Sequence, residues 1–135
     1  MTYLVDVNVL SEPTRAAPNP KVVDWLAAHE RDIVVDAVIL GELRIGILAL
    51  PAGRKRARLE AWFEAVAKTI DCLAWDSAIS MRWADFVVEQ RKKGHTLPVL
   101  DSMIAATALV HGLIVATHNV RDFQVAGIQV VDPFA

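Results

Sequence analysis

The segment Tyr3-Leu4-Val5-Asp6, near the start of the chain, is a short apolar run that ends in an acid. The run predicts a short β-strand with the acid at its carboxyl end. Four further apolar runs follow, at 33–35, 70–73, 113–117 and 129–131. Such runs are too apolar for strands with one face in water, so they predict strands that are covered on both faces.

Longer segments with helical periodicity separate these runs. Leu59, Phe63 and Val66, for example, follow the i, i+4, i+7 spacing of an amphipathic helix. The segments that predict helices are 21–29, 38–50, 59–66, 76–93 and 103–109. Strands that alternate with helices predict an α/β fold of three layers, in which a central parallel sheet is covered by helices on both faces.

Size and composition limit the class of protein further. The chain has 135 residues, so residues 1–135 are expected to form one domain. The net charge of -2 excludes a general nucleic-acid-binding polycation, and any contact with nucleic acid must come from local basic patches. Cys72 is the one cysteine, which excludes an intramolecular disulfide and a cysteine metal cluster; its apolar run predicts a buried, inert thiol.

Nothing in the sequence predicts a membrane protein. The N-terminus has no basic region of the kind that opens a signal peptide. The longest uncharged apolar stretch, 103–116, is shorter than the roughly 20 residues that span a bilayer. We therefore expect a soluble cytoplasmic protein without a membrane-spanning segment. The hydrophobic fraction of 54% indicates a well-buried sheet, an apolar partner surface, or both.

Four acids are placed where a parallel sheet gathers functional residues, near the carboxyl ends of its strands. Asp6 directly follows the first strand, and Asp122 follows the strand at 113–117 after a few loop residues. Asp101 opens a helix after Pro98, and Glu42 lies inside an otherwise apolar helix. An acid in an apolar setting is costly unless something compensates its charge.

Four acids on four elements can share one pocket, and their mutual repulsion then favours a bound cation. Oxygen ligands without Cys or clustered His favour Mg²⁺ or Mn²⁺ over zinc. Such a site suits hydrolysis of a phosphodiester, because one metal lowers the pKa of a bound water and a second, about 4 Å away, stabilises the leaving oxygen.

Each acid also has a purely structural interpretation. Asp6 and Asp122 can be turn residues, and Asp101 can be an acid that the helix dipole favours in a first turn. Glu42 can form an ion pair with Arg44 or Arg15. No single acid is specific, so the hypothesis of a metal site depends on all four together.

Four segments, in order along the chain, resemble the motifs of PIN-domain ribonucleases. They are DVNVL at 6–10, LGELRIG at 40–46, LPVLDSMIAATA at 97–108 and ATHNVRDF at 116–123. The nearest match within the family is the VapC-type toxin of prokaryotic toxin–antitoxin pairs. There are two departures: Val7 stands where the family usually has Thr, and Asp36 stands where Ser or Thr is common before the second acidic segment.

This resemblance implies a Mg²⁺- or Mn²⁺-dependent endoribonuclease with a PIN-like α/β/α fold. It implies that Asp6, Glu42, Asp101 and Asp122 are the catalytic metal ligands, and that Asn8, Thr117 and Asn119 support them. It further implies an RNA substrate such as tRNA or rRNA, a homodimer, and a cognate antitoxin whose tail covers the acidic pocket. Asp36 can still cap the helix that carries Glu42, but it adds negative charge nearby.

Two features outside the four acids have open interpretations. The basic residues Arg54, Lys55, Arg56 and Arg58 form either a patch that binds RNA phosphates or a solvated helix start. His118, inside the last segment, either reaches the substrate or is an exposed loop residue.

Two other functions remain as alternatives. One is a phosphotransferase or phosphatase with an aspartyl nucleophile, which Asn8 disfavours because such enzymes usually have a second Asp at that position. The other is a non-catalytic PIN-like regulator that binds RNA or protein, which the presence of all four acids disfavours.

Overall fold

Five short strands form the centre of the protein in a computed structural model, which describes residues 1–135. The strands are β1 (Tyr3–Val5), β2 (Ile33–Asp36), β3 (Asp71–Leu73), β4 (Ile114–Ala116) and β5 (Val130–Val131). The helices are α1 (Val7–Leu10), α2 (Pro20–Ala28), α3 (Ala37–Leu48), α4 (Arg54–Thr69), α5 (Ser77–Lys92), α6 (Val99–His111) and α7 (Val120–Val125). Short 3₁₀ turns at Glu12–Thr14 and Glu30–Asp32 complete the list.

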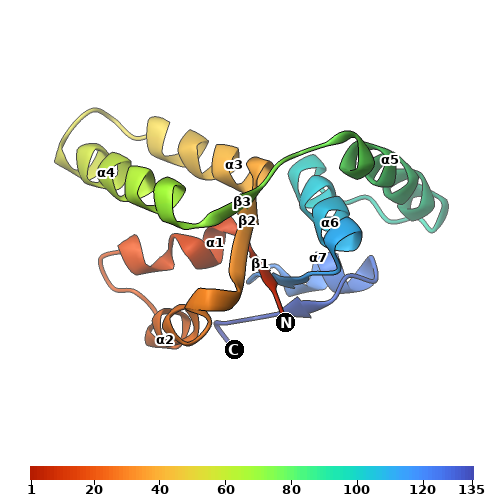
Figure 1. The fold of residues 1–135 in the computed structure, drawn as a ribbon, viewed down its shortest axis with the longest axis horizontal. Helices are drawn as coiled ribbons and strands as arrows, with labels where there is room; N and C mark the ends of the chain where they lie inside the picture. Colours follow the sequence, from red (N-terminus) through yellow and green to blue (C-terminus); the bar gives the residue numbers. More distant parts are fainter.

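All neighbouring strands are parallel, and their order in the sheet is β3-β2-β1-β4-β5. The chain therefore runs outward from β1 to β3 at one edge of the sheet. It then returns to place β4 on the other side of β1, and β5 forms the second edge. Because crossovers between parallel strands are right-handed, the two directions place helices on opposite faces of the sheet. Figure 1 shows this division, with α1 to α4 on one side of the strands and α5 to α7 on the other. The α/β/α prediction is confirmed.

The middle strands supply the centre of the core. Leu4, Val5, Val35 and Val115 are fully buried, as expected for strands that are covered on both faces. Helix α6 brings small residues such as Ala105 against this core. No helix in the structure is both long and apolar enough to cross a membrane.

Some local predictions were wrong or incomplete. Cys72 is exposed rather than buried, because β3 is the edge strand of the sheet. Helices α1 and α7 were not predicted, since four and six residues are too few to show a period. Helix α6 begins at Val99 rather than Met103, directly after Pro98. Because α7 begins at Val120, Asp122 lies in its first turn rather than in a loop.

Candidate metal centre

The order of the strands reverses between β1 and β4, and this is where ligands bind in open parallel sheets. Asp6 follows β1 and Thr117 follows β4. The two strands pair up to their last residues, and the Asp6 backbone N–H donates to the Ala116 carbonyl at 2.9 Å. The sheet therefore brings the first and last acidic segments together although more than 100 residues separate them.

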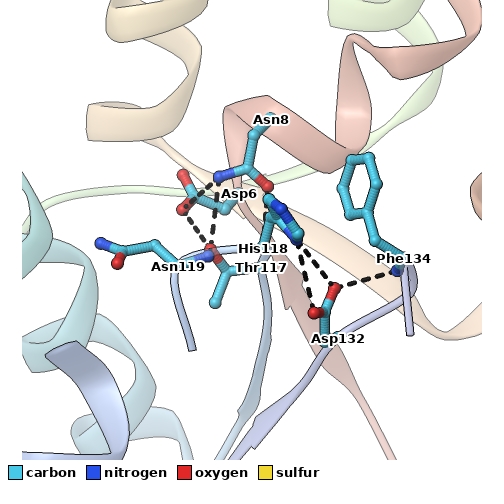
Figure 2. A network of polar contacts seen from close by, with 7 residues as sticks. All are labelled: Asp6, Asn8, Thr117, His118, Asn119, Asp132 and Phe134. Atoms are coloured by element: carbon cyan, nitrogen blue, oxygen red, sulfur yellow. Dashed lines mark hydrogen bonds and ion pairs between the residues drawn. The ribbon is translucent and has the colours of Figure 1, made fainter. Parts of the chain in front are cut away.

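The Asp6 carboxylate is buried and accepts hydrogen bonds on both oxygens. The Val7 N–H donates to Oδ1 at 2.8 Å, and this bond caps α1. The Thr117 hydroxyl donates to Oδ2 at 2.8 Å, and the Asn8 amide donates to the same oxygen at 3.2 Å. Figure 2 shows these side chains converging between the ends of the two strands.

The Thr117 hydroxyl is the centre of this network. While it donates to Asp6, its oxygen accepts from Asn8 Nδ2 at 3.3 Å and from the Asn119 backbone N–H at 3.0 Å. The Thr117 side chain is fully buried and cannot move freely. Its hydrogen bond therefore holds the Asp6 carboxylate in one orientation. Asn8 and Thr117, predicted as supporting residues, thus contact the first acid directly.

Asn119 connects two further acids. Its amide Nδ2 lies 3.1 Å from an oxygen of Asp101 and 3.1 Å from an oxygen of Asp122. Burial, followed by the charges of Asp6 and Asp122, raises the pKa of Asp101 to about 6, while the bond from Asn119 opposes the shift. These charge effects indicate that Asp101 faces the same pocket as Asp6 and Asp122.

Glu42, on α3, differs from the other acids because its Oε1 is buried and has no hydrogen-bond partner. Burial, followed by the charges of Asp6, Asp101 and Asp36, raises the pKa of Glu42 to about 7. The ion-pair interpretation was wrong. Arg15 pairs with Glu12 at 3.4 Å, and the Arg44 guanidinium lies 5.5 Å from the Phe63 ring centroid.

A fifth acid, Asp36, was predicted only as a helix cap. One of its oxygens does cap α3 by accepting from the Ile39 N–H at 2.8 Å. The other accepts from the Thr107 hydroxyl of α6 at 2.6 Å, and burial raises the pKa of this nearly inaccessible carboxyl. Asp36 therefore ties the start of the helix that carries Glu42 to the helix that carries Asp101. Its position directly after a strand was the available sequence signal.

The donor set fits a hard divalent cation in chemistry, since it consists of carboxylate oxygens and includes one buried oxygen without a partner. The side chains do not form a finished coordination shell. No group of three or more Asp, Glu, His or Cys side chains in the structure is arranged to hold an ion. A shared ion therefore requires side-chain rotation, and at Glu42 no hydrogen bond of the buried oxygen has to break for it.

The basic residues at 54–58 lie on the first turns of α4. Arg56 is engaged within the helix, where its Nε lies 2.8 Å from Glu60. Arg54, Lys55 and Arg58 are exposed and form no ion pair. They are therefore free to meet a ligand, although no bond joins them to the acidic pocket.

Comparison with known proteins agrees with this geometry. The family model of the PIN domain matches residues 3–128. The VapC ribonuclease Y4jK of Sinorhizobium fredii is 32% identical, over 97% of this chain and 96% of that protein. The toxin FitB of Neisseria gonorrhoeae is 33% identical, over 97% of each chain.

Solved structures lead to the same family. FitAcB from Neisseria gonorrhoeae superposes with a TM-score of 0.89 and 33% identity, over 98% of this chain and 99% of that one. Similar folds also occur in solved toxin–antitoxin complexes. A family model that covers nearly the whole chain, together with relatives matched end to end, shows that this protein belongs to the PIN-domain family, among relatives that include a VapC ribonuclease and the toxin FitB.

Proposed function

We propose that this protein is a metal-dependent endoribonuclease that acts in the cytoplasm as the toxin of a toxin–antitoxin pair. The observation that carries the proposal is the unpartnered oxygen of Glu42, buried beside the charges of Asp6 and Asp101. A buried carboxylate oxygen without a donor is costly. A cation bound there would remove that cost, and a protein with no use for a cation gains nothing from the arrangement.

Asp6, Glu42, Asp101 and Asp122 would hold Mg²⁺ or Mn²⁺, the cations that oxygen ligands favour. When bound, the metal supplies an activated water as nucleophile and stabilises negative charge on the phosphate. The chain's own residues keep the ligands in place. Thr117 and Asn8 orient Asp6, while Asn119 holds Asp101 and Asp122 on the other side of the pocket. No protein nucleophile is needed.

RNA is the proposed substrate, with tRNA or rRNA as the class that the family resemblance implies. Support comes from the VapC ribonuclease among the relatives and from the exposed cations at the start of α4. With a net charge of -2, the protein needs such a local patch to approach a polyanion, because its overall field does not attract one.

A cognate antitoxin and a homodimer complete the proposal. Toxin–antitoxin complexes among the similar folds support the antitoxin. Support for self-association comes from exposed apolar side chains on α5, where Met81 and Val88 stand two helical turns apart on one face. Light scattering of the purified chain tests the dimer, and a monomer at micromolar concentration would contradict it.

The decisive experiment for the activity is cleavage of total RNA by the purified chain with Mg²⁺, with Mn²⁺ and with chelator. Discrete products are expected only with metal. They should disappear in Asp6→Asn and persist in Asp24→Asn, a matched change at an exposed acid of α2. A folded, partner-free protein that cuts no RNA with either metal would contradict the proposal and favour the non-catalytic regulator.

A further inference from the structure

The bonded network around Asp6 does not end at Thr117 but continues across the sheet to the end of β5. The next residue, His118, donates its backbone N–H to the Asn8 side-chain oxygen at 3.0 Å. Its imidazole packs on the Phe134 ring, with 4.4 Å between centroids and 45° between the planes. Figure 2 shows the two rings side by side, next to the group that includes Asp6.

Asp132, which follows β5, orients both rings. Its Oδ1 accepts the Phe134 backbone N–H at 2.9 Å, and His118 Nδ1 lies 3.4 Å from each of its carboxylate oxygens. With Nδ1 facing this carboxylate, the imidazole turns Nε2 and one ring face outward. The two rings are therefore fixed relative to each other and, through Asn8, relative to Asp6.

The contribution of His118 to the stability of the fold does not explain why it is paired with Phe134 at this position. The His118 side chain is 64% exposed, and an exposed ion pair of this length contributes only about 0–1 kcal/mol. Phe134 is half-buried against the core and keeps part of its ring accessible. Two oriented aromatic rings in reach of solvent, joined by hydrogen bonds to an acidic pocket, suit a planar ligand that lies beside that pocket.

We propose that His118 and Phe134 form a platform on which one nucleobase of the RNA stacks, with Asp132 as its positioning residue. The inference rests on the proposed function and extends it to a substrate subsite. β1 and β5 are two strand spacings apart, about 10 Å. The platform is therefore placed for a nucleotide next to the one at the acids. Phe and His rings are common stacking partners of unpaired RNA bases.

The chain provides its own control. Trp25 and His29 form a second aromatic–imidazole pair, stacked at 4.3 Å between centroids, against Tyr3 at the start of β1. This pair lies at the amino end of β1, whereas Asp6 follows its carboxyl end. Its imidazole is occupied with the Trp25 carbonyl, 2.8 Å from Nδ1. A substitution there changes a His–aromatic contact without approaching the proposed subsite.

The test is binding of fluorescein-labelled single-stranded octaribonucleotides to the full chain, followed by fluorescence anisotropy in chelator. Matched probes in which every base is removed report the backbone contribution. Because no metal is present, binding is measured whether or not the protein cleaves RNA. A failure of the platform is thereby distinguished from a failure of the proposed nuclease activity.

We expect Phe134→Leu, which keeps apolar volume but removes the ring, to weaken binding of the base-containing probe by about 5- to 100-fold. His118→Ala and Asp132→Asn should weaken it by less, whereas Phe134→Trp and His29→Ala should not weaken it. All variants should bind the abasic probe like the unmodified chain. Since His118 is exposed, His118→Ala keeps the test valid even if changes at Phe134 disturb folding.

Two results would overturn the inference. One is unchanged affinity of His118→Ala, and of Phe134→Leu where that variant folds, for the base-containing probe. The other is an equal loss on the base-containing and abasic probes, which would mean that the pair acts on the backbone or on the fold and not on a base.

Discussion

The acidic pocket has two sides that are built in different ways. On the strand side, Asp6 accepts three hydrogen bonds, from Val7, Asn8 and Thr117. On the helix side, the buried oxygen of Glu42 accepts none, and burial together with neighbouring acids raises the pKa of Glu42 to about 7. The strand side is complete within the protein, whereas the buried oxygen of Glu42 on the helix side is satisfied only by something that the protein binds. Asp6 is thus a proposed metal ligand that the protein already holds in position, whereas Glu42 is a proposed metal ligand that still requires its cation.

The largest expected effect comes from removing either acid. Asp6→Asn and Glu42→Gln should each lower RNA cleavage by more than about 100-fold, beyond the 10- to 100-fold typical of residues that only orient a ligand. Their effects on the metal-free protein should differ. Glu42→Gln removes a repelled charge and should raise the Tm at pH 8. Asp6→Asn replaces an accepting oxygen with an NH₂ group that faces other donors, so it should lower the Tm.

Calorimetry in chelator, beside the cleavage assay, measures both quantities. Asp24→Asn on the surface of α2 is the control and should change neither. Equal Tm changes in the two pocket variants would mean that the two sides are not built differently, and the contrast between them would be lost.

A smaller effect is expected from Thr117, whose hydroxyl is the centre of the hydrogen bonds on the strand side. Thr117→Val keeps the side-chain volume but removes the hydroxyl that holds Asp6 and receives Asn8 and Asn119. We expect a loss of about 1–3 kcal/mol of stability, because buried groups lose their partner. Cleavage should fall about 10- to 100-fold.

The matched control for this change is Thr69→Val. Thr69 is exposed on α4, where its hydroxyl bonds the Ala65 carbonyl, so both quantities should stay near those of the unmodified chain. Full activity of Thr117→Val would show that Asp6 needs no orientation by the hydroxyl.

The same contrast explains how much the sequence could predict. Asp6 and Asp122 were predicted because the strand before each is apolar and acids after parallel strands share one edge. Glu42 was predicted because an acid in an apolar helix is costly. The fold followed from the alternation of strands and helices. Each of these signals is local in the sequence.

Other features depend on contacts between distant segments and have no local signal. The bond between Asp36 and Thr107 joins residues 71 positions apart, and Asn119 reaches Asp101 on another helix. The exposure of Cys72 depends on the order of strands in the sheet, which periodicity does not reveal. Asp132 follows a strand of only two residues, too short to draw attention to the acid after it.

The helix side also predicts an effect of pH. A carboxyl whose pKa is higher in the folded than in the unfolded protein binds more protons when folded, so stability falls as pH rises between the two values. For Glu42 this window runs from about 4.5 to about 7, and Asp101 adds a loss from about 4 to about 6. The Tm of the chelated protein should therefore decline over these ranges.

Mg²⁺ or Mn²⁺ should restore the Tm most strongly near and above pH 7, where Glu42 is ionised without metal. Glu42→Gln should flatten the upper part of the decline, between about pH 6 and 7, and leave the lower part that Asp101 causes. A Tm that rises with pH through this window in chelator would contradict the assignment of both acids to one uncompensated pocket.

The smallest expected effect concerns the basic start of α4, which lies outside both sides of the pocket. Arg54, Lys55 and Arg58 are exposed and unpaired, whereas Arg56 is held by Glu60. Replacing the three free cations with Ala should weaken RNA binding and lower the slope of log affinity against log salt by about 2, since each contact with a single-strand phosphate contributes about 0.7. The matched variant replaces Arg91, Lys92 and Lys93, which are equally exposed at the end of α5. If both triple variants lose the same slope, the basic start of α4 acts only through net charge, and RNA approaches the acids without a dedicated path along that helix.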